Sequence, residues 1–278
     1  MSAGKLSKIV LPVFLLSFYA FSADGFVAYN PATEEEEIIF IPVEKEKNMG
    51  KNINEQVCEK FKLPVDPLVQ RRIEEMGKRL AGGTDRRDIV YHFRVLNHEK
   101  DDYYNAFAAP GGYIYIFDDL LEVMENDDRI AAVLAHEMGH IEARHSVKRL
   151  QGSLGVTALM ILGSQMNTEE GTRARVNNAI GQLMAAYSRH DEWEADELSV
   201  KYLKHAGYDP NGAVQALEEL KKLRKNGPVR KYMFYKSHPY LSSRIAHLNK
   251  LVKGYTDFDS YINFTRVDGD MKKKGGLK

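Results

Sequence analysis

The chain has 278 residues, which is long enough to bury a substantial core in one or two domains. It carries 39 basic and 39 acidic side chains, and this neutral balance gives no indication of a nucleic-acid partner. The single cysteine, Cys58, excludes an intrachain disulfide, so it is buried, paired with another chain or free.

The N-terminus carries a predicted targeting signal. Lys5 and Lys8 precede an uncharged run, 9–23, whose fifteen residues fall short of the roughly 20 needed to span a bilayer. We therefore expect residues 1–22 to be a cleaved signal peptide that directs export to the periplasm. An uncleaved membrane anchor is the alternative, because Pro12 and several bulky aromatic residues blur the pattern.

The rest of the chain divides into three parts. Residues 23–53, which include the acidic run 34–37, are expected to form an extended lead-in. Residues 54–265 are expected to form one folded domain, and residues 266–278 a basic, flexible tail.

Several elements are predicted inside this domain. Asp66-Pro67 is expected to begin a helix that ends at Gly82-Gly83. Apolar and polar residues alternate at 91–95, which predicts a half-buried strand, and 113–117 predicts another strand of the same small sheet. The apolar segment 154–166 is too short to cross a membrane, so we expect an amphipathic or buried helix there.

His136-Glu137-Met138-Gly139-His140 is the most informative motif, and it lies in a helical pattern that Asn126 or Asp127 can cap. Histidines four residues apart lie about 40° from each other around a helix, so both imidazoles point into one pocket. That spacing suits two ligands of a tetrahedral zinc ion, with Glu137 as the general base. Two surface histidines at helical spacing are the alternative interpretation of the motif alone.

Spacing removes two candidates for a third ligand. A metzincin would need glycine and histidine where this chain has Ala143 and Ser146. His145 lies about 180° around the helix from His136, so it is not expected to share the same metal ion.

The acidic stretch that follows offers better candidates. Ser188 and Asp191 resemble a capping box, so a second helix is expected to begin there. Glu192 and Asp196 share one face of that helix, whereas Glu194 lies about 200° away from Glu192. One carboxylate ligand and one carboxylate that orients a ligating histidine would complete a zinc site. Taken alone, this patch is more typical of a solvated helix face.

Together these motifs resemble those of a known family, the gluzincin-type zinc metallopeptidases related to HtpX and the prenyl-protein endopeptidases. Further similarity lies in Asn105-Ala106-Phe107, in residues 110–115, and in Ser237-His238-Pro239 followed by Arg244. The similarity runs from about 30 to 252 and is closest to soluble periplasmic members such as BepA and LoiP. The fold that this resemblance implies is α+β and mainly helical, a zincin-like domain with a small β-sheet beside the zinc helix.

The resemblance also implies roles for residues around the metal. His136, His140 and Glu192 would bind one Zn²⁺ per chain, and Glu137 would activate a water molecule. Asp196 would hold His136 in the ligating tautomer.

Roles farther from the helix pair follow from the same resemblance. His238 would either stabilise the oxyanion or occupy the open coordination position, and Arg244 would support the same region as a catalytic residue. Asn105, Gly111 and Gly112 would belong to the substrate-binding strand pair, to whose edge a peptide adds as an extra strand.

The expected function is therefore zinc-dependent hydrolysis of peptide bonds in misfolded or misassembled cell-envelope proteins. The expected partners are polypeptide substrates, together with components of the membrane surface or of outer-membrane assembly. The alternative is a periplasmic chaperone or assembly factor that keeps a latent zinc site.

Overall fold

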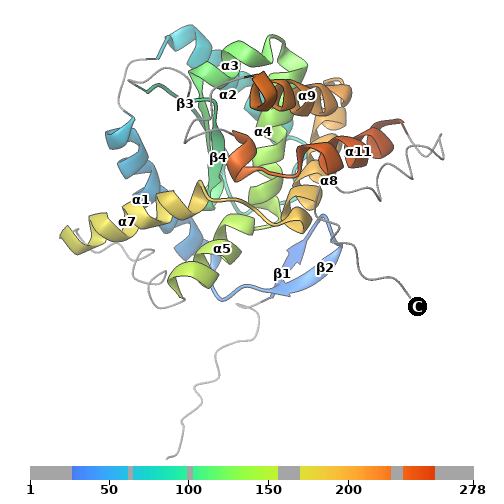
Figure 1. Ribbon diagram of the computed structural model, residues 1–278. Coiled ribbons are helices and arrows are strands. Elements are labelled where there is room, and N and C mark those ends of the chain that lie inside the picture. Colours follow the sequence, from blue (N-terminus) through green and yellow to red (C-terminus); the bar gives the residue numbers. More distant parts are fainter. Residues whose placement is uncertain (1–26, 62–64, 99–102, 156–169, 227–233, 254–278) are drawn as a thin grey trace, which may run out of the picture.

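The computed structural model describes residues 27–61, 65–98, 103–155, 170–226 and 234–253 (Figure 1). The expected signal peptide, most of the apolar segment that begins at Leu154, and the expected basic tail lie outside the described residues. None of the helices within these ranges is long and apolar enough to cross a membrane.

The expectation of an extended lead-in is wrong. Strands β1 (Val27–Asn30) and β2 (Glu35–Ile38) pair as an antiparallel hairpin. Helix α1 (Val43–Lys60) follows, so the expected domain boundary at residue 54 falls inside a helix.

This part of the chain is folded because α1 carries an apolar stripe. Met49, Ile53 and Val57 recur every four residues and are buried, although polar residues surround them in the sequence. Gly50 packs so closely on the neighbouring turn that an added Cβ would lie 2.1 Å from the Pro110 carbonyl oxygen. The tight contact places α1 in the folded domain.

The predicted helix and strands are present within one or two residues. Helix α2 (Pro67–Ala81) begins after Asp66, whose side chain accepts a hydrogen bond from the Leu68 amide. Strand β5 (Tyr113–Phe117) lies between β3 (His92–Leu96), to which it is parallel, and β4 (Ala106–Ala109), to which it is antiparallel.

The turn η2 (Pro110–Gly112) joins β4 to β5, and the remaining elements are helices. They are α3 (Asp118–Met124), α4 (Asp127–Glu142), α5 (His145–Leu154), α7 (Glu170–Leu183), α8 (Arg189–Ala206), α9 (Asn211–Asn226), α10 (Phe234–Ser237) and α11 (Leu241–Lys253). The α+β, mainly helical fold with a small sheet beside the motif-bearing helix is confirmed.

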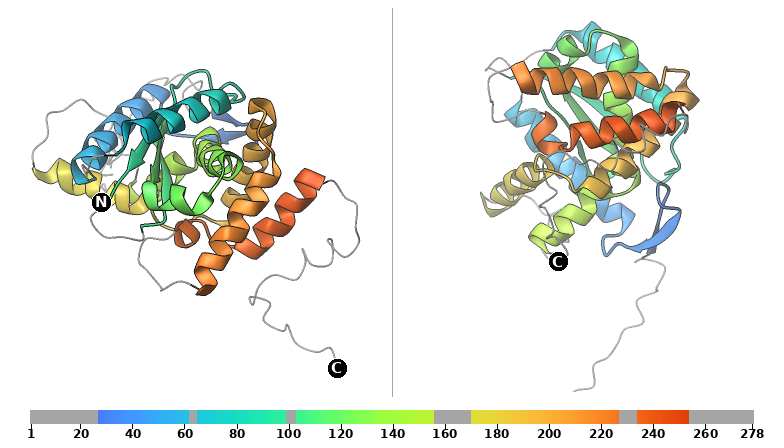
Figure 2. Two further views of the ribbon diagram at one scale, coloured as in Figure 1. Left: turned by 90° about the horizontal axis from the view of Figure 1, so that it is seen from above. Right: turned by 45° about the vertical axis from the view of Figure 1, so that its right-hand side comes forward.

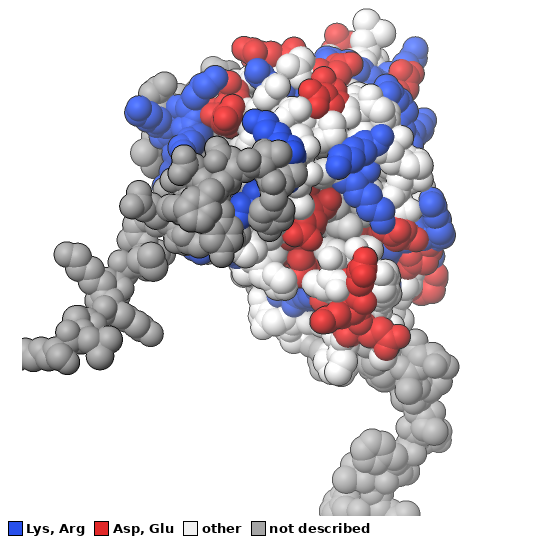
Figure 3. All heavy atoms as spheres, turned by 90° about the vertical axis from the view of Figure 1, so that its right-hand side faces the viewer, with Lys and Arg blue, Asp and Glu red and all other residues white. Residues whose placement is uncertain are grey.

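The sheet separates two hydrophobic cores, because successive side chains of a strand point to opposite faces. On β5, Ile114 and Ile116 pack into the core that contains α2, α4 and α8, whereas Tyr115 and Phe117 pack into the core that contains α1, α5 and α7. Figure 2 shows α4 near the middle of the molecule, with α1 and α7 on one side and α8 and α11 on the other. Acidic and basic side chains are interspersed over the face drawn in Figure 3, in keeping with the balanced composition.

Candidate metal centre

Helices α4 and α8 carry the motif residues and lie in close contact. The Asn126 side chain caps α4, and Ser188 with Asp191 forms the predicted capping box of α8. Gly139 allows the close approach, because a Cβ at this position would lie only 2.7 Å from the Ala195 carbonyl oxygen. The glycine inside the motif therefore lets α8 come near enough to bring its first turn to the two histidines of α4.

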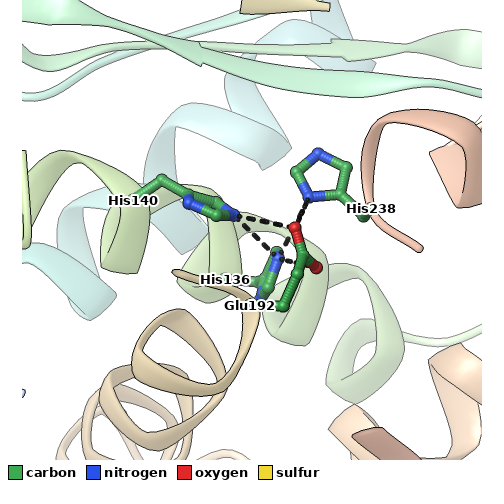
Figure 4. Close-up of side chains that lie close together, drawn as sticks. All are labelled: His136, His140, Glu192 and His238. Atoms are coloured by element: carbon green, nitrogen blue, oxygen red, sulfur yellow. Dashed lines mark hydrogen bonds and ion pairs between the residues drawn. The ribbon is translucent and has the colours of Figure 1, made fainter. Parts of the chain in front are cut away.

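Four buried side chains converge between these helices and the segment after α10 (Figure 4). They are His136, His140, Glu192 and His238, and one ligand atom from each lies within 4.8 Å of the others. The Nε2 atoms of His136 and His140 are 3.1 Å apart. The nearest Glu192 carboxylate oxygens lie 3.5 Å from His136 Nε2 and 3.7 Å from His140 Nε2.

These separations fit a tetrahedral metal ion. Zinc binds nitrogen and oxygen at about 2.0–2.1 Å, so two of its ligand atoms in a tetrahedron lie about 3.3 Å apart. His238 Nδ1 lies 3.3 Å from His136 Nε2 and 3.1 Å from Glu192 Oε1, which fits the fourth corner. The donor set of three imidazoles and one carboxylate suits zinc among the common metals.

The Glu137 side chain is buried beside this group of four side chains. Among the described residues, neither of its carboxylate oxygens has a hydrogen bond, and His238 Nε2 lies 3.3 Å from Oε1. Burial raises the pKa of Glu137 above its ordinary value, although the nearby His238 and His136 act in the opposite direction. A carboxyl group in such a setting is suited to take up a proton.

Asp196 and Arg244 support the first histidine and the carboxylate. Arg244 Nε and Nη2 lie 2.9 and 2.7 Å from the two Asp196 carboxylate oxygens, and Nη1 lies 2.5 Å from Glu192 Oε2. Asp196 Oδ1 is 3.0 Å from His136 Nδ1, as expected for a carboxylate that sets a tautomer. Burial alone would raise the pKa of Glu192, but Arg244 and His238 lower it, so this side chain is ionised.

This geometry gives Arg244 a positioning role. The expected catalytic role would require N–H groups that are free to face a substrate, whereas the guanidinium is buried and bound to two carboxylates. The same pair of carboxylates, Asp196 and Glu192, outweighs burial and Arg244 and raises the pKa of His136 to about 9.

His238 is enclosed by aromatic side chains that the sequence did not single out. The Phe234 ring stacks on the His238 ring at 4.1 Å, and Tyr187 stacks on His140 at 3.9 Å. The Tyr187 amide donates to the Ser237 carbonyl oxygen at 2.9 Å, which ties the segment before α8 to the segment that carries His238. Arg149 lies over the Tyr187 ring, 3.5 Å from its centroid.

The three residues expected to bind substrate separate into two groups. Asn105 is buried near the His238 segment, where its side-chain oxygen accepts a hydrogen bond from the Ser237 hydroxyl at 3.3 Å. Gly111 and Gly112 instead form a tight turn with φ values of 74° and 97°. An added Cβ on Gly112 would lie 2.2 Å from the Val90 carbonyl oxygen, so backbone geometry alone explains this glycine.

His145 and Glu194 are the residues whose importance the sequence interpretation missed. Neither belongs to the group of four, in line with the helix geometry. Both are nevertheless buried behind it, and His145 Nδ1 lies 2.8 Å from His140 Nδ1. The projection assumed a continuous helix, whereas α4 ends at Glu142 and Arg144, with φ of 53°, turns the chain and brings His145 next to His140.

The fold and the site define a class of protein. A helix with His-Glu-x-x-His, a carboxylate from a second helix and a small sheet alongside form the framework of a metallopeptidase domain. Residues 67–252 match peptidase family M48, and the chain belongs to this family. This membership confirms the family that the motifs indicated and places the chain among metalloendopeptidases.

Individual relatives, all of them named as proteases or endopeptidases, are similar to this chain at modest sequence identity. The β-barrel assembly-enhancing protease of Escherichia coli (strain K12) is 28% identical over 189 residues, which cover 65% of this chain and 38% of that protein. Metalloprotease YcaL of the same strain is 31% identical over 181 residues, covering 64% and 68%. Mitochondrial metalloendopeptidase OMA1 of Schizosaccharomyces pombe is 26% identical over 226 residues, covering 80% and 65%. The match thus spans about two fifths of the assembly-enhancing protease.

Proposed function

We propose that this chain is a zinc-dependent endopeptidase that hydrolyses peptide bonds of misfolded or misassembled cell-envelope proteins. The observation that carries the chemistry is the convergence of His136, His140, Glu192 and His238 beside the buried carboxyl group of Glu137. The envelope substrates are supported by the predicted signal peptide and by the name of the assembly-enhancing relative. The same two observations support a periplasmic location.

Each side chain then has a defined task. His136, His140 and Glu192 would hold one zinc ion, which when bound polarises a scissile carbonyl group and acidifies a water molecule. Glu137 would act as the general base towards a water molecule and as the general acid towards the leaving amine. Asp196 keeps the proton of His136 on Nδ1, so that Nε2 faces the site with its lone pair. Arg244 keeps Glu192 ionised and in place.

His238 is the residue that decides between an open and a latent site. A catalytic zinc ion keeps one position open for water, and His238 Nδ1 stands where a fourth ligand would stand. The four candidate ligands and Glu137 are buried. A peptide therefore reaches them only after the segment that carries His238 and the segment that carries Tyr187 move away. We therefore assign the described arrangement to a latent form in which His238 closes the site.

A chaperone or assembly factor with a structural zinc site is the second candidate. The fourth-ligand position of His238 favours it, because structural zinc sites are closed by four protein ligands. Glu137 argues against it, since a structural site gains nothing from a buried carboxyl group whose desolvation costs free energy.

Replacement of Glu137 separates the two candidates. Glu137→Gln should retain about one zinc ion per chain and lose hydrolysis of an unfolded protein substrate, because Glu137 supplies a base and no ligand. Glu197→Gln, on the exposed side of α8, serves as the matched control and should keep both properties. Zinc content would be measured by elemental analysis, and cleavage by electrophoresis. Loss of zinc from Glu137→Gln, or full activity in that variant, would sink the assignment.

The substrate class calls for a cellular measurement. Envelope proteins that accumulate in cells with Glu137→Gln, and not in cells with the active chain, would be identified by quantitative proteomics. Enrichment of misassembled outer-membrane proteins is expected. An unchanged envelope proteome would contradict the proposed substrates without affecting the proposed chemistry.

A further inference from the structure

The second motif histidine has a buried partner on the side away from the site. His140 presents Nε2 to the group of four, while its Nδ1 lies 2.8 Å from His145 Nδ1. His145 Nε2 in turn lies 3.0 Å from Glu194 Oε2. The three side chains come from α4, α5 and α8 and are all buried, so solvent does not compete for these contacts.

The chemistry of the groups sets the direction of each hydrogen bond. An ionised carboxylate only accepts, so Glu194 accepts from Nε2–H of His145. A neutral His145 then presents an unprotonated Nδ1, which accepts from Nδ1–H of His140. His140 is left with its lone pair on Nε2, which is the atom that faces the site.

The N-terminal hairpin holds the far end of this chain of contacts. Asn30, at the end of β1, donates from Nδ2 to Glu194 Oε2 at 2.8 Å and to Glu37 Oε1 at 2.9 Å. Its side-chain oxygen accepts from the Ala32 amide at 3.0 Å, which fixes the orientation of the amide group. Asn30 is only 1% exposed, and Figure 1 shows the hairpin at the end of α8 where these contacts form.

We propose that Asn30, Glu194 and His145 are positioning residues that hold His140 in its metal-ligating tautomer, and that the N-terminal hairpin is thereby part of the metal centre. The two motif histidines are thus supported differently: His136 by the Asp196 carboxylate directly, and His140 by a carboxylate acting through a second histidine. The hairpin lies outside residues 67–252, the part of the chain that matches the family. The inference rests on the proposed zinc site and extends it to a segment for which the sequence predicted no role.

Zinc affinity of the full chain, measured by competition with a chromophoric chelator, tests the role of His145. His145→Ala should weaken zinc binding by about 10- to 100-fold, the usual effect of removing a partner of a metal ligand. His145→Asn should recover much of this loss, because its side-chain oxygen replaces Nδ1 as an acceptor. His190→Ala is the matched histidine control: His190 reaches the other oxygen of Glu194, yet its side chain is 72% exposed, and zinc affinity should stay unchanged.

A second pair of variants tests the hairpin. Asn30→Ala should weaken zinc binding, by less than His145→Ala, whereas its neighbour Tyr29→Ala, at a position 58% exposed, should not. Thermal unfolding of the metal-free variants is measured in parallel, since a purely structural role would lower the unfolding temperature without changing zinc affinity. Wild-type affinity in both His145→Ala and Asn30→Ala would overturn the positioning role. Failure of the wild-type chain itself to bind zinc would instead refute the proposed function.

Discussion

Gly139 offers a direct test of how the fold builds the metal centre. Gly139→Ala adds a Cβ that would lie 2.7 Å from the Ala195 carbonyl oxygen and 2.8 Å from the Ala195 Cα. Ordinary contacts begin at 3.4 Å, so α4 and α8 have to separate by about 0.7 Å. Backbone atoms form this contact, and they cannot rotate away as the end of a flexible side chain would.

The shift matters more for metal binding than for stability. Overpacking costs roughly 1–3 kcal/mol, and the better helix propensity of alanine offsets about 1 kcal/mol of that cost. Zinc–ligand distances tolerate only about 0.2 Å, and Glu192 stands one turn before Ala195 on the displaced helix. We therefore expect zinc affinity to fall by roughly 10- to 100-fold, the loss seen when the support of a metal ligand is disturbed.

Chelator competition measures the affinity, and thermal unfolding of the metal-free chain measures the stability. Gly181→Ala is the matched control, because Gly181 lies in α7 and no described atom lies within 4 Å of an added Cβ. This control should be slightly stabilised and should bind zinc as the wild type does. Wild-type zinc affinity in Gly139→Ala would show that the helix separation does not limit the site, and the reasoning would fail.

Three further predictions concern single side chains. His238→Ala should bind zinc nearly as well as the wild type and show equal or higher activity on an unfolded substrate, because the side chain that closes the site is removed. A fall of about 100-fold in turnover with zinc retained would instead indicate an oxyanion role. Glu192→Ala should lose zinc affinity strongly, while Glu197→Ala on the same helix should not, and equal losses would place the third ligand elsewhere. Glu194→Gln should be less stable mainly near neutral pH. Burial would raise the pKa of Glu194, but hydrogen bonds from His145 and Asn30 lower it from 4.5 to about 2. The stabilisation is therefore complete above about pH 4.5 and is lost as the pH falls through 2, so urea unfolding of the metal-free chain should show the two proteins converging in acid. A difference in stability between Glu194→Gln and the wild type that stays constant over this pH range would contradict the prediction.

The sequence by itself determined the elements whose signals are local. The Asn126 cap and the Ser188 capping box define the starts of α4 and α8 within a few residues of the signal itself. Four-residue spacing placed His136 and His140 on one face of α4 by helix geometry alone. The family followed from these motifs because their spacing is short and their residue types are specific.

Contacts between distant residues were decided only by the tertiary structure. Asn30 and Glu194 are 164 positions apart, and nothing near either residue in the sequence indicates the other. The same holds for Tyr187 against His140, and for a middle strand, β5, with one parallel and one antiparallel neighbour. The acidic hairpin was expected to be an extended lead-in for a related reason. Its buried Asn30 and its Glu37 find their partners on α8 and α5, Glu194 and Lys148, which a local pattern does not contain. Helices and caps arise from hydrogen bonds within a few residues, whereas the supports of the metal centre arise from packing among α4, α5, α8 and the hairpin, and this packing exists only once the chain has folded.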